Sequence, residues 1–551
     1  MSLLRRADTE MRSSDPRILL CRARRGGFSR ADPLGVSIPR ARLRMGKGTE
    51  AAWVPLRLRC AVQNYDWGRF GEESAVARLF ERNSGAEVEL ERPYAEFWIG
   101  THESGPSFVE AGGLGTASVT LKEWIGMNPG VLGEKVEAKW GRDLPFLFKV
   151  LSVAKALSIQ AHPDKELARM LHEMRPNVYK DPNHKPEMAI ALTEFKALCG
   201  FIGVEELKNV LTCVPEITEL VGNEEANKLI SAKSLDEDLN TKVLLKSIFT
   251  KLMSTSKEAV ADLVSKLKGR LDVENKLACI SCNRLLIAVP DFSTFLAKLI
   301  LAVLENTLEN VSGNFGLLQS ETYFPFIELK DVTSKSIKTL LVIAGMNNCF
   351  QETFLIIRTL TEKEQLVLLL EKQYQADVGV IAAFFFNYLR LNPGEALYIG
   401  PNEPHAYLSG ECIECMAASD NVVRAGLTPK YIDVQTLCSM LTYRQGFPEI
   451  IHGVPLNPHV KRYTAPFDEF EVDHCLLQPK ESVVFPAIPG PSIFLVVAGE
   501  GKMHMASEVE GQKIAKGDVY FVPTQNEIRL SAAADEQISI FRAGVNSRIF
   551  D

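Results

Sequence analysis

No uninterrupted apolar run in this sequence is long enough to cross a membrane. Charge-free apolar stretches such as 378–389 and 339–351 are short, whereas a membrane-spanning helix needs about 20 apolar residues. A secretory signal is also lacking, because the arginine-rich N-terminus is not followed by an apolar core. We therefore expect a cytoplasmic protein with no membrane partner, in which the 11 cysteines are reduced.

An excess of basic residues is lacking as well. The chain has 62 Lys and Arg against 69 Asp and Glu, a net charge of −7. Residues 1–50 carry +7, which leaves −14 on the remainder. An acidic body argues against nucleic acid as a partner. A small anionic substrate would need basic residues gathered locally.

Residues 1–50 show no apolar periodicity, and we expect a disordered extension outside the fold. Two interpretations stay open. Arginine-rich, serine-containing segments can be organelle transit peptides, although five acidic residues are many for such a peptide. Alternatively, the functional chain begins near Met45.

The remainder changes from strand-like to helical patterning and back. Runs rich in β-branched and aromatic residues, bounded by Gly and Pro, predict strands over 94–100, 145–151 and 157–162. Apolar residues at helical spacing predict helices over 205–214, 224–231 and 244–271. Thr361 and Glu364 have the spacing of a capping box. A mainly β protein with an inserted α-helical domain follows, organised as catalytic domain 55–203 and 376–448, helical domain 204–375, and all-β domain 449–551.

One segment carries a metal-ligand pattern. Gln160 and His162 are two residues apart on a predicted strand, so both project from one face. Lys185 and Glu187 likewise share a face, and His405 follows a proline-rich turn. An amide oxygen, two imidazoles and a carboxylate would suit Zn²⁺. A single histidine in a β protein, however, is more often a satisfied polar residue than a ligand.

Several longer motifs resemble one known family. Gln160-Ala-His162-Pro-Asp-Lys-Glu-Leu, Asn183-His-Lys-Pro-Glu-Met-Ala-Ile-Ala-Leu192 and Pro404-His-Ala-Tyr-Leu408 are similar to type I phosphomannose isomerases. So are Asn64-Tyr-Asp-Trp-Gly68 and the run from Glu411 to Arg424-Ala-Gly-Leu-Thr-Pro-Lys430. The resemblance covers about 56–276 and 358–551.

The resemblance implies a zinc-dependent aldose–ketose isomerase that interconverts mannose 6-phosphate and fructose 6-phosphate and feeds mannose and GDP-mannose metabolism. It implies a catalytic cupin (jelly-roll) domain, a helical domain and a second cupin-like domain, in a monomer with one Zn²⁺ per chain. The ligands it implies are Gln160, His162, Glu187 and His405, and its catalytic arginine falls on Arg424. Its substrate-binding residues match Trp67, Lys185, Tyr407, Glu414, Asp420 and Lys430.

These residue types fit the chemistry. Isomerisation through an enediol develops negative charge on oxygen, which a Lewis-acidic metal stabilises. A guanidinium such as that of Arg424 is a permanent donor to such oxygens or to a phosphate. Glu414 is a candidate for the proton-transferring base, although the sequence does not decide this assignment.

Residues 277–357 depart from the family pattern. This segment is apolar, without clear helical or strand periodicity, unlike an ordinary surface loop. An aberrant splice form and an additional helical subdomain are both open interpretations.

The cysteine pairs Cys279/Cys282 and Cys412/Cys415 are too far apart for a zinc module. No histidine follows Pro523 where a metal-binding cupin would have one, so we expect the C-terminal domain to be metal-free.

Three alternatives to an active isomerase remain. They are a cupin that binds metal and sugar phosphate without turnover, an Fe(II) oxygenase, and a catalytically defective splice form. Gln160 fits the two-histidine, one-carboxylate pattern of the oxygenase poorly.

Overall fold

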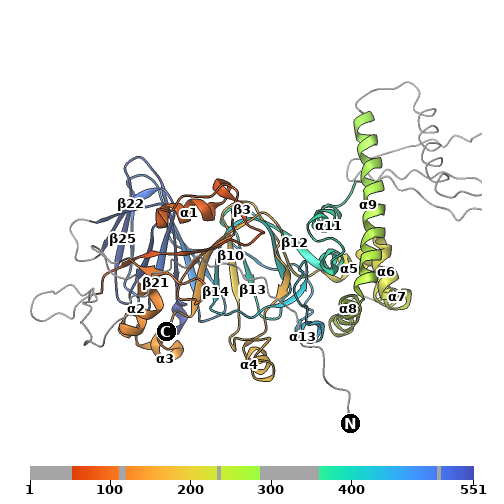
Figure 1. The fold of residues 1–551 in the computed structure, drawn as a ribbon, viewed down its shortest axis with the longest axis horizontal. Coiled ribbons are helices and arrows are strands. Elements are labelled where there is room, and N and C mark those ends of the chain that lie inside the picture. Colours follow the sequence, from red (N-terminus) through yellow and green to blue (C-terminus); the bar gives the residue numbers. More distant parts are fainter. Residues whose placement is uncertain (1–52, 111–118, 233–236, 286–358, 506–510) are drawn as a thin grey trace, which may run out of the picture. The chain divides into compact units, whose positions relative to one another are not determined.

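The computed structural model describes residues 53–110, 119–232, 237–285, 359–505 and 511–551. The expected extension 1–50 and most of the expected insertion 277–357 lie outside these residues. The described chain folds as antiparallel β-sheets with a helical region, which confirms the predicted mainly β fold with a helical domain and is consistent with the cupin fold (Figure 1).

An 11-stranded sheet forms the centre of the fold. Its main path runs β16-β13-β10-β14-β8-β5-β2, and β9, β11, β12 and β15 attach to it. The bounds are β2 Ala61–Gln63, β5 Glu96–Ile99, β8 Phe146–Val153, β9 Ile159–Ala161, β10 Glu187–Ala191, β11 Phe195–Phe201, β12 Phe386–Leu391, β13 Ala396–Ile399, β14 His405–Ala417, β15 Val423–Gly426 and β16 Ile450–Ile451.

The long strand β14 joins two parts of this sheet. Its first half pairs with β11, and its second half pairs with β8 and β10. The change of partners falls at Gly410, whose φ is +112° and where a Cβ would lie 2.4 Å from the carbonyl oxygen of Glu194. Only glycine fits such a bend, and through it β14 takes part in both walls around the site.

The helical region interrupts two neighbouring strands. β11 and β12 pair antiparallel. The helices that the structure describes between these two strands follow the end of β11, and the chain re-enters the sheet at the start of β12. The bounds are α5 Val204–Cys213, α6 Pro215–Val221, α7 Asn223–Ser231, α8 Glu237–Met253, α9 Lys257–Leu285, α11 Glu362–Gln373 and α12 Val378–Ala382. The expected helix 244–271 is two helices separated at 254–256, and α9 runs into the expected insertion.

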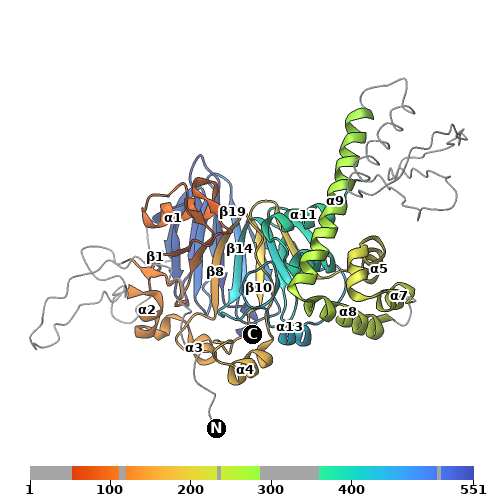
Figure 2. The ribbon, with the colours of Figure 1, turned by 45° about the vertical axis from the view of Figure 1, so that its right-hand side comes forward.

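These helices lie beside the strands of the central sheet (Figure 2), and one cluster of buried apolar residues includes side chains of both. Phe249 of α8 meets Phe201 of β11 with ring centroids 5.3 Å apart. Tyr443 stacks on Phe201 with ring centroids 5.2 Å apart. Burying such rings stabilises the contact by about 1.5–3 kcal/mol each. The helical region is therefore anchored directly to the strands that carry the site.

The C-terminal domain is built from a nine-stranded and a four-stranded sheet that share an apolar core. The larger has the order β17-β18-β19-β26-β21-β24-β1-β6-β7 and the smaller β20-β25-β22-β23. The bounds are β1 Leu56–Arg59, β6 Phe108–Val109, β7 Val119–Thr120, β17 Val454–Asn457, β18 Val460–Thr464, β19 Glu471–Leu477, β20 Ser482–Phe485, β21 Ser492–Ala498, β22 Glu500–Met505, β23 Gln512–Ala515, β24 Val519–Val522, β25 Ile528–Ala532 and β26 Ile538–Gly544.

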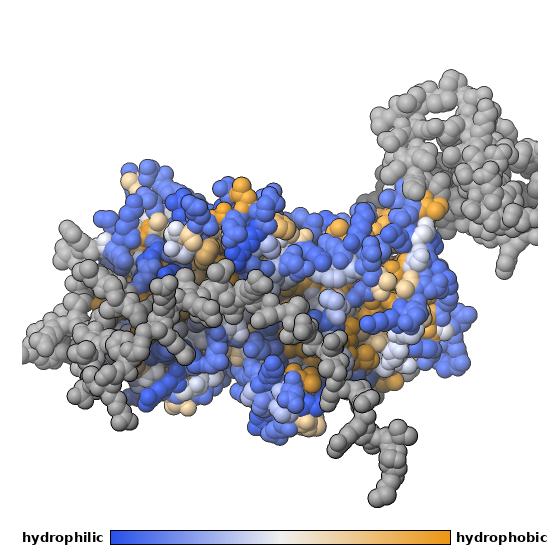
Figure 3. All heavy atoms as spheres, in the orientation of Figure 1, coloured by the Kyte–Doolittle hydropathy of each residue, from blue (hydrophilic) through white to orange (hydrophobic). Residues whose placement is uncertain are grey.

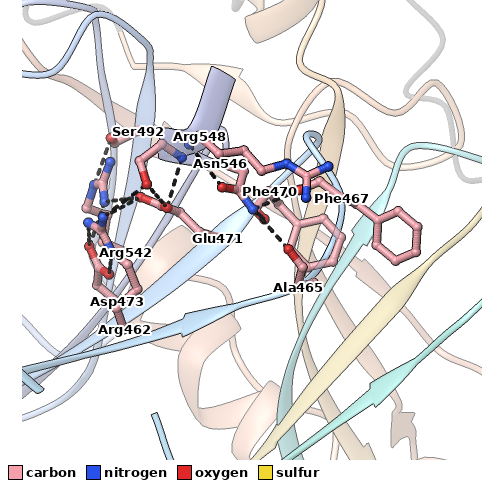
Figure 4. A network of polar contacts seen from close by, with 11 residues as sticks. Arg462, Ala465, Phe467, Phe470, Glu471, Asp473, Ser492, Arg542, Asn546 and Arg548 are labelled. Carbon is pink, nitrogen blue, oxygen red and sulfur yellow. Dashed lines mark hydrogen bonds and ion pairs between the residues drawn. The ribbon is translucent and has the colours of Figure 1, made fainter. Parts of the chain in front are cut away.

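A buried ionic network stabilises this domain (Figure 4). Arg542 donates to Asp473 at 2.6 Å and to Ser492 at 2.9 Å, and Arg462 donates to Asp473 at 2.7 Å. Two arginines thus share a carboxylate that is fully buried. Because removing one partner would leave a buried charge unpaired, the network ties β18, β19 and β26 together.

Polar residues cover most of the face shown in Figure 3, and apolar residues form small groups between them. Within the described ranges, no helix combines the length and the apolar character that crossing a membrane requires.

Candidate active site

Three strands bring two histidines and a glutamate together. His162 directly follows β9, Glu187 begins β10 and His405 begins β14. The Nε2 atom of His162 lies 3.2 Å from Glu187 Oε1, and that of His405 lies 3.3 Å from Glu187 Oε2. All three side chains are buried. One ligand atom from each lies within 4.8 Å of the others, close enough to hold one metal ion.

The hydrogen bonds of the two imidazoles show which ring nitrogens carry the protons. His162 Nδ1 lies 2.6 Å from the carbonyl oxygen of Asn421, and His405 Nδ1 lies 3.1 Å from that of Glu403. A carbonyl only accepts, so each Nδ1 carries the proton and, in a neutral ring, each Nε2 presents a lone pair. Burial lowers the pKa of His162 to about 4, which keeps this ring neutral.

The lone pairs of both rings therefore face the carboxylate of Glu187. Neither Nε2 atom, nor Glu187 Oε2, has a hydrogen-bond partner among the described residues. Buried acceptors that converge without a donor are costly. A divalent cation at their centre would satisfy all of them, and the carbonyls of Asn421 and Glu403 orient the imidazoles as metal sites require. The donor set thus fits a metal such as zinc.

Gln160 lies beside this cluster. In the β-ladder it is directly opposite His405 on one side and Arg424 on the other. Opposed residues on antiparallel strands project from the same face, so the three side chains share one face. Gln160 also lines the cavity next to the cluster.

A cavity of about 710 Å³ opens in front of Glu187. Its walls come from the central sheet, from the end of α11 and from the segment after β15. All the candidate substrate residues and the candidate catalytic arginine line it, namely Trp67, Lys185, Tyr407, Glu414, Asp420, Arg424 and Lys430. The volume is of the size that proteins use for small ligands.

Five Lys and Arg side chains line this cavity together with six carboxylates, and most of the lysines pair with carboxylates of the wall. Lys185 Nζ lies 3.3 Å from Glu187 Oε1. Arg424 is half-buried, burial lowers its pKa, and no carboxylate pairs with it in the part of the chain that the structure describes. An unpaired, partly desolvated guanidinium favours an anionic ligand.

Tyr407, Asp420 and Trp67 occupy different parts of the wall. Burial raises the pKa of Tyr407 well above its ordinary value, and its hydroxyl has no hydrogen-bond partner among the described residues. Asp420 pairs with His102 at 3.3 Å near the exposed rim. Trp67 stacks on Tyr65 with ring centroids 5.8 Å apart. The three thus offer, respectively, a neutral donor, a carboxylate and an aromatic face to a ligand.

Lys149 is a site residue that the sequence analysis missed. Its ammonium is buried and lies 2.9 Å from Glu414 Oε2 and 3.3 Å from Glu96 Oε2. Glu96 also accepts a hydrogen bond from Trp98 Nε1 at 2.6 Å. Burial raises the pKa of Glu414 against the attraction of Lys149. The available signal was a lysine as the single charged residue of the mostly apolar strand β8, since such a charge is rarely buried without a role.

The structure is thus a mainly β fold with a helical insertion, consistent with the cupin fold, in which a His-Glu-His cluster that could hold a metal ion lies beside a cavity of small-ligand size. Family models identify it more closely. The type I phosphomannose isomerase catalytic-domain model matches residues 56–204, and the helical insertion-domain model of the same family matches 220–288.

Relatives agree over most of the chain. Mannose-6-phosphate isomerase 2 of Arabidopsis thaliana is 50% identical over 90% of this chain and 94% of its own, and the Homo sapiens mannose-6-phosphate isomerase is 35% identical over 88% and 97%. The chain therefore belongs to the type I phosphomannose isomerase family. A crystal structure of a mannose 6-phosphate isomerase bound with zinc and yttrium has the same fold, at a TM-score of 0.62 and 22% identity over 89% of this chain and 99% of that one.

Proposed function

We propose that this protein is a zinc-dependent isomerase that interconverts mannose 6-phosphate and fructose 6-phosphate. The observation that carries the proposal is the set of buried polar atoms without hydrogen-bond partners on His162, Glu187 and His405, beside a cavity whose wall includes two cations, Arg424 and Lys430, that have no ion pair among the described residues. A metal centre alone would fit many reactions. Its combination with cationic side chains favours a phosphorylated substrate, as the names of the relatives suggest.

One Zn²⁺ per chain would be held by His162, Glu187, His405 and Gln160. When bound, it supplies Lewis acidity toward oxygens that become negative during isomerisation. The carbonyls of Asn421 and Glu403 keep both imidazoles in the ligating tautomer. Lys185, at 3.3 Å from Glu187, reduces the negative charge of the centre.

Glu414 and Lys149 form the acid–base pair that we assign to proton transfer. The reaction moves one proton between C1 and C2 of the sugar through an enediol. A carboxylate whose pKa is raised by burial is a stronger base than an exposed one, and the ammonium of Lys149, which donates to Glu414 Oε2 at 2.9 Å, orients this base while its other oxygen faces the substrate proton. Arg424 donates to the anionic oxygens of the substrate.

The decisive measurement is turnover of mannose 6-phosphate to fructose 6-phosphate by the full chain, with bound metal determined by elemental analysis. Zinc-dependent turnover is the expected result. A folded, zinc-loaded chain without turnover would overturn the proposal in favour of a sugar-phosphate-binding cupin, and iron in place of zinc would favour an oxygenase. The same assay on a chain lacking 277–357 identifies a defective full-length form, because only the shortened chain would then be active.

A further inference from the structure

Arg424 lies on a short strand, β15, that has few pairing contacts. β15 spans only Val423–Gly426, and β9 is its only partner strand in the described parts of the chain. The ladder shifts register between Arg424 and Gly426, so the pairing is irregular beside the arginine. Arg424 itself has no ion pair within the described ranges that would fix its guanidinium. Some other contact must therefore hold the end of β15 and the segment that follows it.

Asp377 provides such a contact from 50 residues away. Its Oδ1 accepts hydrogen bonds from the backbone N–H of Leu427 at 2.6 Å and of Gly379 at 2.7 Å. Its Oδ2 accepts from the N–H of Thr428 at 3.1 Å. One carboxylate thus caps the start of α12 and binds the two residues after β15. Charge-assisted bonds to backbone N–H groups are about twice as strong as neutral ones.

The backbone at this junction is also shaped for the contact. A Cβ on Gly426 would lie 2.5 Å from the Cα of Gly379, and one on Gly379 would lie 2.4 Å from the Leu427 nitrogen. Leu427 has φ +51°, a conformation that costs an L-residue about 1 kcal/mol or more. A strained residue persists only where its surroundings hold it, and here the carboxylate of Asp377 does so.

We infer that Asp377 is a positioning residue that sets Arg424 and Lys430 in the cavity, and this inference rests on the isomerase function proposed above. The segment held by Asp377 includes Thr428 and ends at Lys430, and both line the cavity with Arg424. Asp377 acts through the backbone of the segment 427–430, because its hydrogen bonds fix the position of that segment and so the positions of the Arg424 and Lys430 side chains. It joins the end of the helical region to the catalytic domain at the site itself.

The test combines Asp377→Ala with Arg424→Ala in a double-mutant cycle on kcat/KM. Asp377→Ala alone is expected to lower kcat/KM by about 10²-fold, since a displacement of about 1 Å can cost that much. In the Arg424→Ala background it is expected to cost less than about tenfold, because one of the two positioned cations is already gone and only Lys430 remains. Full additivity would overturn the inference, since a general loss of stability adds in both backgrounds. Asp377→Asn keeps the acceptor for Leu427 and Gly379 but places an amide NH2 opposite the Thr428 N–H, so it is expected to rescue only part of the loss.

A second readout does not depend on turnover. Amide hydrogen exchange at Leu427 and Thr428 is expected to be slow in the wild-type chain and at least tenfold faster in Asp377→Ala, with metal content unchanged. Asp518→Ala is the matched control, because Asp518 accepts from the N–H of Ala515 at 2.8 Å in the C-terminal domain, and it should leave both readouts unchanged. Unaltered exchange in Asp377→Ala overturns the inference. An inactive wild-type chain with protected amides overturns the proposed function instead.

Discussion

Arg424 faces the cavity as a half-buried guanidinium without a carboxylate partner in the described residues. Arg424→Ala should lower kcat by about 10²–10³-fold, because it removes a donor to the developing oxyanion. Metal content should not change, since Arg424 is not part of the His-Glu-His cluster. Arg390→Ala is the matched control, because Arg390 pairs with Glu362 outside the cavity. Steady-state kinetics with near-normal turnover for Arg424→Ala would remove this residue from the mechanism.

His474 gives the C-terminal domain a pH dependence of its own. The ring stacks on Phe541 at 4.2 Å, and burial lowers its pKa from 6.5 to about 4. Between these values the unfolded chain binds a proton that the folded chain does not, so the free energy of unfolding falls as the pH drops from about 6.5 to 4, by up to about 3 kcal/mol.

His474→Phe should keep the stack and remove this titration. The variant should therefore lose about 2–3 kcal/mol less unfolding free energy than the wild-type chain between pH 7 and pH 4.5. Urea unfolding at the two pH values measures the difference. Equal acid-induced losses in both proteins would show that His474 is already charged in the folded state.

At the scale of elements, helix α9 contains a glycine, Gly269, at a position where there is space for a side chain. A Cβ on Gly269 would meet no atom within 4 Å. Gly269→Ala should stabilise the helical region by about 0.5–1 kcal/mol, because alanine loses less backbone entropy in a helix. Gly426→Ala is the contrasting variant and should destabilise, since its Cβ would lie 2.5 Å from Gly379. Thermal unfolding of both checks the prediction, which fails if Gly269→Ala lowers the midpoint.

The sequence predicted most elements that carry the site. Gln160 lies on strand β9 and His162 directly follows that strand, and the capping box at Thr361 and Glu364 begins α11. The break within the expected helix 244–271 was missed, although Ser256 accepts from the N–H of Ala259 as a local cap does. An apolar period continues across such a break, so periodicity alone does not reveal it.

Contacts between residues that are distant in the sequence could not be predicted from it. Lys149 meets both Glu96 and Glu414 because β8 pairs with β5 on one side and with β14 on the other. Asp377 reaches Leu427 only because α12 packs on β15. Spacing within a segment shows which face a side chain takes, but it does not show which segments become neighbours. Motifs read along the chain therefore identified candidate ligands better than the groups that orient them.

On the scale of the whole molecule, the start of the described chain completes the C-terminal domain. β1 pairs with β24 through Leu56 and Phe521, and Arg57 also donates to Asp518 at 2.9 Å. A strand pairing across more than 400 residues leaves no local pattern in the sequence. In sequence, the strands of the central sheet thus lie between β1 and β24, which pair with each other in the nine-stranded sheet. We therefore expect that the two β domains do not unfold independently.

The metal centre also couples distant parts of the chain. Its candidate ligands come from β9, β10 and β14, and the whole helical region lies in sequence between Glu187 and His405. These ligand atoms are brought together only in the folded chain, so a bound metal stabilises folding by mass action. At a free metal concentration about 1,000 times Kd, this amounts to about 4 kcal/mol.

Chelation should therefore lower the thermal unfolding midpoint by several degrees and abolish turnover together, and added zinc should restore both. His405→Ala is the matched variant, because it removes one ligand, and its midpoint should not respond to the chelator. His474→Ala, a histidine substitution far from the cluster, should respond as the wild-type chain does. Zinc content by elemental analysis accompanies each scan. Full zinc occupancy in His405→Ala would contradict the assignment of His162, Glu187 and His405 as the metal site. A wild-type midpoint that chelation leaves unchanged would contradict it as well.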